Sequence, residues 1–213
     1  KYINFNGSDR YIGTVYQMTA SNNDQNTRSY ITGNFDFRFL GNTIECEAIF
    51  PKKFEIGNEL YFPTPFVSCS IFGTHQALSN SADIAWITPD SGSLQVLAVK
   101  PDIDSKDVRF LLTSSFMDVF LTSSLFYDVF DQEKWNFAIR LKHNNYPITE
   151  FSTINTDTTA SYTIEFYGVN AVQDILQQSF ILTASVLQSK ADEYFKCAKR
   201  LYVGSHYTNF TGS

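Results

Sequence analysis

The chain contains 213 residues, with 16 Lys and Arg against 22 Asp and Glu, so its formal net charge is −6. Its basic residues stand at most in pairs such as Lys199-Arg200, which argues against the basic stripe of a nucleic-acid binder. No apolar run approaches the ~18 residues of a membrane-spanning helix. Phe and Tyr number 20 and 12, and strand formers dominate, so the composition predicts an all-β fold.

Alternating apolar residues predict a series of strands in the N-terminal half. The first alternation ends at Asn6-Gly7, a dipeptide that is a strong hairpin signal. The segment 18–32 is polar and rich in Asn and Ser, so we expect a surface loop. Further strands are predicted at 33–40, 44–50, 66–72, 82–87 and 94–99.

The most regular alternation in the chain begins at Trp135. Trp135, Phe137, Ile139 and Leu141 fall on one face, so we expect all four to be buried. Upstream, LTSSFMDVF at 112–120 is followed by LTSSLFYDVF at 121–130, and this near-duplication predicts successive strands joined by Ser-Ser turns. The segments 162–166 and 201–204 also alternate and are predicted strands.

Two segments are predicted to be helical. The segment 171–180 carries apolar residues at helical spacing, and 191–199 is compatible with one or two helical turns. Against about a dozen strand signals they are minor additions. Together, these strand and helix signals predict one domain over 1–213, an antiparallel two-sheet sandwich.

Five short motifs occur in order along the chain. They are FNGSDRYI at 5–12, the segment from Phe35 to Lys52 with Ile44 to Glu47 in it, KWN at 134–136, TIEFYG at 163–168 and KRLYVGSHYTNFTG at 199–212. Together they resemble the laminin-G-like, concanavalin A-like lectin/glucanase superfamily, and the resemblance implies a jelly-roll fold. The close of the chain is also similar to such domains in tailed-phage virion proteins.

The chain departs from that family at three points, of which one is that the Trp of the family's second strand is absent. Tyr167 stands where the family hairpin carries Asp, and the family has one more strand after Gly212. That final strand is either missing or supplied from outside the fragment. We therefore expect 201–204, or the strand beside it, to lie against another chain or segment.

A glucanase of this fold class uses Glu-x-Asp-x-Glu on one strand, because alternate residues face the same side and set two carboxyl groups ~5 Å apart. The nearest approach is Glu45-Cys46-Glu47, with Ala48 and Phe50 following. We expect both glutamates to face solvent and the chain not to be an enzyme. The glucanase remains the alternative.

The three cysteines, Cys46, Cys69 and Cys197, are odd in number and widely spaced, so we expect free, structural thiols. A Cys197–His206 pair would lack an orienting partner. The histidines are too scattered for a metal triad. No cofactor is expected.

Calcium remains a possible ligand, since this fold often binds it at the rim of a sheet through oxygen ligands. The candidate residues are Asn22, Asn23 and Asp24, with Asp102 and Asp104 as a second oxygen-rich loop. For a glycan or a protein partner, the candidates pair aromatic with polar side chains and are Asp83, Trp86, His206, Tyr207 and Asn209. The alternatives are a Trp86 in the core and solvated turns.

These observations favour a non-catalytic virion structural or adhesin module of a bacteriophage. We expect it to bind a surface glycan or another virion protein, to form part of a larger or oligomeric assembly, and to be located in the virion. The third hypothesis is a purely architectural sandwich without a ligand.

Overall fold

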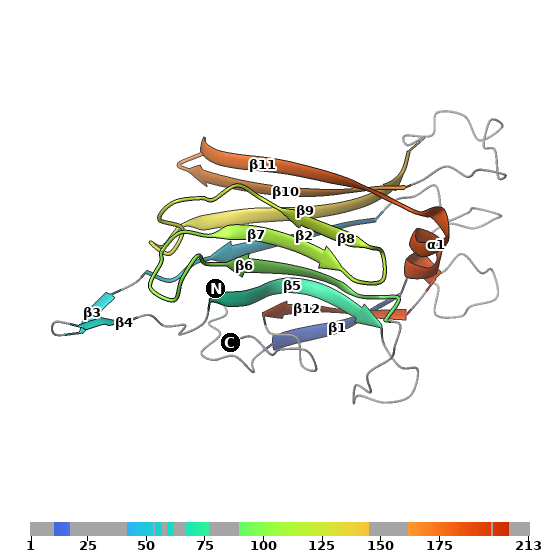
Figure 1. The fold of residues 1–213 in the computed structure, drawn as a ribbon, viewed down its shortest axis with the longest axis horizontal. Coiled ribbons are helices and arrows are strands. Elements are labelled where there is room, and N and C mark those ends of the chain that lie inside the picture. The colour runs from blue at the N-terminus through green and yellow to red at the C-terminus, as the bar shows by residue number, and fades with distance from the viewer. Residues whose placement is uncertain are drawn as a thin grey trace.

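The computed structural model describes residues 11–17, 42–52, 54–56, 59–61, 67–76, 90–144, 162–196 and 198–204. For 11–17, 54–56, 59–61, 196 and 198–200 it describes the backbone alone. Two antiparallel sheets pack face to face, and a short helix lies at one end of them (Figure 1). This arrangement confirms the all-β sandwich of two antiparallel sheets that the sequence predicts.

The larger sheet has six strands. Their spatial order is β1 (Tyr11–Gln17), β12 (Ala198–Gly204), β5 (Ser68–Gln76), β6 (Leu94–Val99), β7 (Arg109–Ser114) and β8 (Val119–Thr122). Every neighbouring pair is antiparallel. The predicted strands at 66–72, 94–99 and 201–204 all lie in this sheet.

The smaller sheet has four strands, in the order β11 (Ile175–Val186), β10 (Tyr162–Val172), β9 (Lys134–His143) and β2 (Asn42–Ile49). It contains the predicted strands at 44–50, 162–166 and the one that begins with Trp135. A separate two-stranded ribbon, β3 (Phe54–Ile56) and β4 (Glu59–Tyr61), extends away from both sheets (Figure 1).

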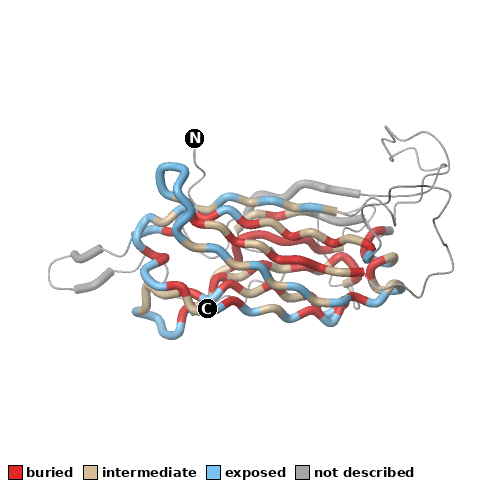
Figure 2. The backbone as a smooth tube through the Cα atoms, turned by 90° about the horizontal axis from the view of Figure 1, so that it is seen from above, coloured by how far each residue is buried: buried red, intermediate tan, exposed pale blue. Residues whose placement is uncertain are grey.

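Aromatic side chains from both sheets fill the space between them. Trp135, Phe137, Ile139 and Leu141 are at most 2% exposed, which confirms the prediction made from their alternation. Across the sandwich, the Phe110 ring of β7 lies 4.7 Å from the Trp135 ring and 4.8 Å from the Phe137 ring, centroid to centroid. The buried residues run through the middle of both layers (Figure 2).

The prediction of a helix at 171–180 is wrong. This segment is the hairpin between β10 and β11, whose turn residues Gln173 and Asp174 have φ of 51° and 64°. Two consecutive positive φ values are typical of a tight hairpin turn. The apolar residues around the turn are exposed, by 55% at Val172 and 64% at Ile175, so they do not form the buried face of a helix.

The second predicted helix exists with different bounds. Helix α1 runs over Gln188–Lys196, and β12 begins at Ala198, so the end of the predicted segment is strand. Tyr194 and Phe195 are buried and contact both sheets, Tyr194 through Thr74 of β5 (3.1 Å between hydroxyl oxygens) and Phe195 through the Tyr162 ring of β10 (5.8 Å). The helix thus closes one end of the sandwich.

The prediction of successive strands in the duplicated segment, 112–120 and 121–130, is confirmed only in part. The β7–β8 hairpin contains the first copy and the first two residues of the second, Leu121 and Thr122. The rest of the second copy makes a single bridge, Val108 to Phe126, and no further strand. Phe126, Val129 and Phe130 insert into the core from an irregular loop, in which Asp128 has a positive φ of 57°. Burial of these side chains, rather than strand pairing, determines the path of the second copy.

The sequence predicts that 201–204, or the strand beside it, lies against another chain or segment. Strand β12 pairs with β1 on one side and with β5 on the other, so 201–204 itself is not an open edge, and the expectation for the strand beside it stays a prediction. Its neighbour β1 is the strand at that edge of the described sheet. The predicted hairpin at Asn6-Gly7, the loop at 18–32 and the strands at 33–40 and 82–87 lie outside the described residues.

Candidate functional site

In the described part of the chain, charged and hydrogen-bonding side chains are most concentrated on the outer face of the four-stranded sheet. Residues that alternate with the buried aromatics of β9 and β10 point to this face. The register pairs Arg140 of β9 with Glu165 of β10, and Lys142 with Thr163. Opposite charges on adjacent strands are thus brought side by side.

Glu165 is the centre of this arrangement and is only 7% exposed. Its Oε2 accepts hydrogen bonds of 2.6 Å from Arg140 Nε and of 2.6 Å from the Tyr167 hydroxyl. Its Oε1 is paired with Lys142 Nζ at 2.8 Å. Arg140 also donates to the Tyr167 hydroxyl at 3.0 Å. We call these four residues, Arg140, Lys142, Glu165 and Tyr167, the Glu165 cluster.

The electrostatics of the cluster follow from these contacts. Burial acts to raise the pKa of Glu165, but the hydrogen bonds from Lys142, Tyr167 and Arg140 outweigh it and lower the pKa to about 2. The same contacts raise the pKa of Arg140, through its hydrogen bond to Glu165. Glu165 is therefore a carboxylate at any physiological pH.

The cluster leaves its two cations partly open to solvent. The side chains of Arg140 and Lys142 are 39% and 22% exposed. The guanidinium of Arg140 also lies over the ring of Tyr167, 5.8 Å from its centroid. A planar donor and a half-exposed aromatic ring are the groups that contact hydroxyl-rich or acidic ligands.

Glu45 and Glu47 lie on β2 at the edge of the same face, and both are exposed, as the sequence predicts. Glu47 pairs with Lys134 at 2.8 Å, and both side chains are nearly half exposed. Their cross-strand partners on β9 are Ala138 and Asn136, so the register brings no third carboxylate beside them.

Unlike Glu165, two carboxyl groups of the described residues have a raised pKa, in each case chiefly because of burial: Asp90 and Glu133. Asp90 accepts hydrogen bonds from the backbone N–H of Gln76 (2.8 Å) and of Gly92 (3.1 Å). Glu133 accepts one from Trp135 Nε1 at 2.9 Å. Both carboxyl groups thus hold a turn or a core side chain in position.

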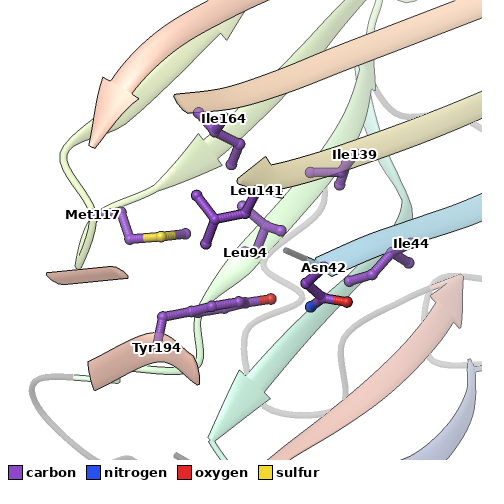
Figure 3. A pocket seen from close by; sticks show the side chains of 8 residues that line it. All are labelled: Asn42, Ile44, Leu94, Met117, Ile139, Leu141, Ile164 and Tyr194. Atoms are coloured by element: carbon purple, nitrogen blue, oxygen red, sulfur yellow. The ribbon is translucent and has the colours of Figure 1, made fainter. Parts of the chain in front are cut away.

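The space between the sheets near α1 is a packing gap and not a ligand cavity. It is too narrow for a water-sized sphere, and Met117, Leu141 and Tyr194 project into it (Figure 3). Its other lining residues are mostly aliphatic side chains of the core: Asn42, Ile44, Leu94, Ile139 and Ile164.

Cys46 and Cys69 are free thiols, and burial raises the pKa of each to about 11. Cys197 lies outside the described residues, as does His206. The other two histidines lie in different sheets, His75 on β5 and His143 on β9. No group of three or more metal-ligating side chains occurs within the ranges that the structure describes.

The structure leaves most predicted ligand residues untested. The calcium candidates Asn22, Asn23 and Asp24 and the glycan or partner candidates Asp83, Trp86, His206, Tyr207 and Asn209 lie outside the described residues. Asp102 and Asp104 are described and exposed. Asp102 Oδ1 accepts the Asp104 backbone N–H at 2.9 Å, so this oxygen closes a turn.

Sequence reasoning did not identify the Glu165 cluster. The signal was present, since Arg140, Lys142 and Glu165 all fall on the polar side of alternating strands. What the sequence lacks is the register between β9 and β10, which decides that Arg140 and Glu165 are neighbours.

Among the described helices, none is long and apolar enough to cross a membrane. In comparisons with known proteins, no family model, no curated protein and no solved structure matches the chain.

Proposed function

We propose that the chain is a non-catalytic binding module with a concanavalin A-like jelly-roll fold, and that it recognises a surface glycan as part of a bacteriophage particle. The jelly-roll connectivity, the virion location and the ligand class rest on the resemblance of its five sequence motifs. The proposed binding surface is the Glu165 cluster on the outer face of the four-stranded sheet.

The observation that carries the proposal is that both carboxylate oxygens of Glu165 have side-chain partners. Both of its oxygens accept hydrogen bonds from neighbouring side chains, so the carboxylate fixes the positions of Arg140 and Lys142. Donors that are already fixed lose little conformational entropy when a ligand binds. The remaining N–H groups of these cations and the ring of Tyr167 form a flat, donor-rich surface. Such a surface suits a sugar that carries hydroxyl or carboxylate acceptors.

The same geometry favours binding over hydrolysis. A glycosidase needs a protonated carboxylic acid facing a second carboxylate across the sugar. Glu165 is ionised, because its pKa is lowered to about 2. Both of its oxygens are already bonded to neighbouring side chains. Glu45 and Glu47 point to open solvent, and Glu47 is paired with Lys134.

A glycan array followed by titration of the best ligand tests the proposal. Replacing Lys142 by Gln should weaken binding about tenfold, the effect of one charge-assisted hydrogen bond. Lys134→Gln is the matched control, because it removes the same charge from the same face of β9 outside the cluster. Binding to no glycan, or equal loss in both variants, would contradict the proposed ligand or surface.

The non-catalytic part is tested on the same preparation by assaying the release of reducing sugar from the glycans that bind. We expect none. Release that disappears in Glu45→Gln or Glu47→Gln would establish the glucanase instead.

A further inference from the structure

In the described part of the chain, strand β11 is an edge strand that carries none of the residues that usually protect an edge. It forms one edge of the four-stranded sheet, and within the described residues it pairs only with β10. Its sequence, ILQQSFILTASV, contains no charged residue, no Pro and no Gly. Proteins usually protect a long edge with charges, Pro or bulges, because its unpaired backbone groups accept another strand. The one bulge of the β10–β11 pair lies at the hairpin end and leaves 178–186 regular. The opposite edge of this sheet, β2, is protected by Glu45 and Glu47.

The sandwich core is also open along this edge. Phe180, Leu182 and Ala184 point into the core but are only half-buried, whereas Ile164 and Phe166 on the adjacent β10 are fully buried. Strand β8, the edge of the other sheet, lies against β11, and its core-facing Leu121 is half-buried too. Apolar side chains of both sheets are therefore exposed on one side of the molecule.

We propose that two copies of this chain associate by antiparallel pairing of their β11 strands, which joins two four-stranded sheets into one continuous sheet. The partner is a second copy because the strand is complementary to itself. Since β11 carries no charge, no like charges meet when it pairs with its twin. A two-fold axis also closes the assembly at two copies and leaves no further β11 edge.

The register of this pairing follows from the face that each residue occupies. A bulge at the hairpin end leaves 178–186 as the regular part of β11. Pairing must keep core-facing residues on the core side, so only residues of equal parity can be opposite each other. An axis through Leu182 pairs the whole regular segment with itself. It sets Phe180 of one copy opposite Ala184 of the other, a large side chain against a small one, and Leu182 against Leu182.

Sedimentation over a range of concentrations tests the proposal, with Ile181→Lys as the main variant. Ile181 is 58% exposed on the outer side of β11 and lies next to the proposed axis. The two introduced lysines would lie close together, so the dissociation constant of the dimer should rise at least ~tenfold. Two controls should leave it unchanged: Ile181→Thr keeps an uncharged strand former, and Ile103→Lys adds the same charge at a loop residue that is 47% exposed.

Hydrogen exchange of the unmodified chain gives a second readout that does not depend on any variant folding. Amides in 178–186 should become more protected as the concentration rises, whereas those in β2 should not. A chain that stays monomeric at its highest soluble concentration would overturn the proposal. So would a dimer that is indifferent to Ile181→Lys or that gains no protection in β11.

This outcome is separable from that of the proposed glycan binding. Raising the salt concentration should weaken a ligand held by Arg140 and Lys142, because it screens their charges. It should not weaken the β11 dimer, which involves no charged pair and joins two chains of net charge −6. A β11 dimer that dissociates in high salt would contradict the proposed interface.

Discussion

The ring of Phe180 on β11 packs directly against the backbone of Gly168 on β10. A Cβ atom at position 168 would lie 2.1 Å from Cε1 of that ring. Gly168 and Phe180 are cross-strand partners, and the ring is further held by Phe166 (5.0 Å) and Phe110 (5.7 Å), centroid to centroid. The absent side chain at 168 thus makes the space in which an edge residue reaches the core.

Gly168→Ala is therefore expected to destabilise the fold, although alanine is normally the better strand residue. Overpacking of this kind costs about 1–3 kcal/mol in the free energy of unfolding. Urea denaturation followed by circular dichroism measures it. In the background of Phe180→Leu, the same change should cost much less, because the shorter side chain vacates the contact. Equal costs in both backgrounds would show that the ring is not the obstacle.

Trp135→Ala should cost on the order of 3–5 kcal/mol in the free energy of unfolding, because the indole is fully buried between the sheets. The variant also leaves Glu133 without its hydrogen-bond donor. Tyr127→Ala, at an exposed aromatic, is the control and should change stability by no more than ~0.5 kcal/mol. A similar small effect at Trp135 would contradict the proposed core.

The Glu165 cluster predicts a specific loss of stability in acid. The pKa of Glu165 is about 2 in the folded chain, below its usual 4.5, so its stabilising effect is complete above the unfolded pKa. That effect is lost progressively as the pH falls from about 5 towards 2. Glu165→Gln should flatten this part of the curve of unfolding free energy against pH. Glu45→Gln removes an exposed carboxylate and should leave the curve nearly as it is.

Thiol reactivity tests the cysteine assignment. We expect all three thiols to react under denaturing, non-reducing conditions. In the folded protein Cys46 and Cys69 should react slowly, because burial raises their pKa to about 11 and little thiolate forms near neutral pH. Detection of a single reactive thiol after denaturation would mean that the other two form a disulfide.

The sequence predicted those parts of the fold in which one face of a strand is buried. Trp135 to Leu141 alternate because the core accepts every second side chain, and that rule is local. The prediction from helical spacing failed at 171–180, where Val172, Ile175 and Leu176 lie at an exposed hairpin tip. Apolar spacing there reflects no buried face, and Gln173-Asp174 is not a familiar hairpin dipeptide.

The candidate site could be predicted much less well, because it depends on contacts distant in sequence. Arg140 and Glu165 are 25 positions apart and become neighbours only through the register of β9 on β10. Alternation indicated that each faces outward. It carried no information on which residue of the next strand lies opposite, since that depends on how the whole sheet is aligned.

The position of β12 between β1 and β5 has a consequence for the order of folding during synthesis. Strand β1 is made before the other strands of its sheet, yet in the described sheet its only hydrogen-bonded neighbour is β12, which emerges from the ribosome about 180 residues later. Strands β5 to β8 can assemble by local hairpins, whereas β1 must wait until β12 has been made. A chain stopped before residue 198 should therefore leave β1 accessible to proteases, and completion of β12 should protect it.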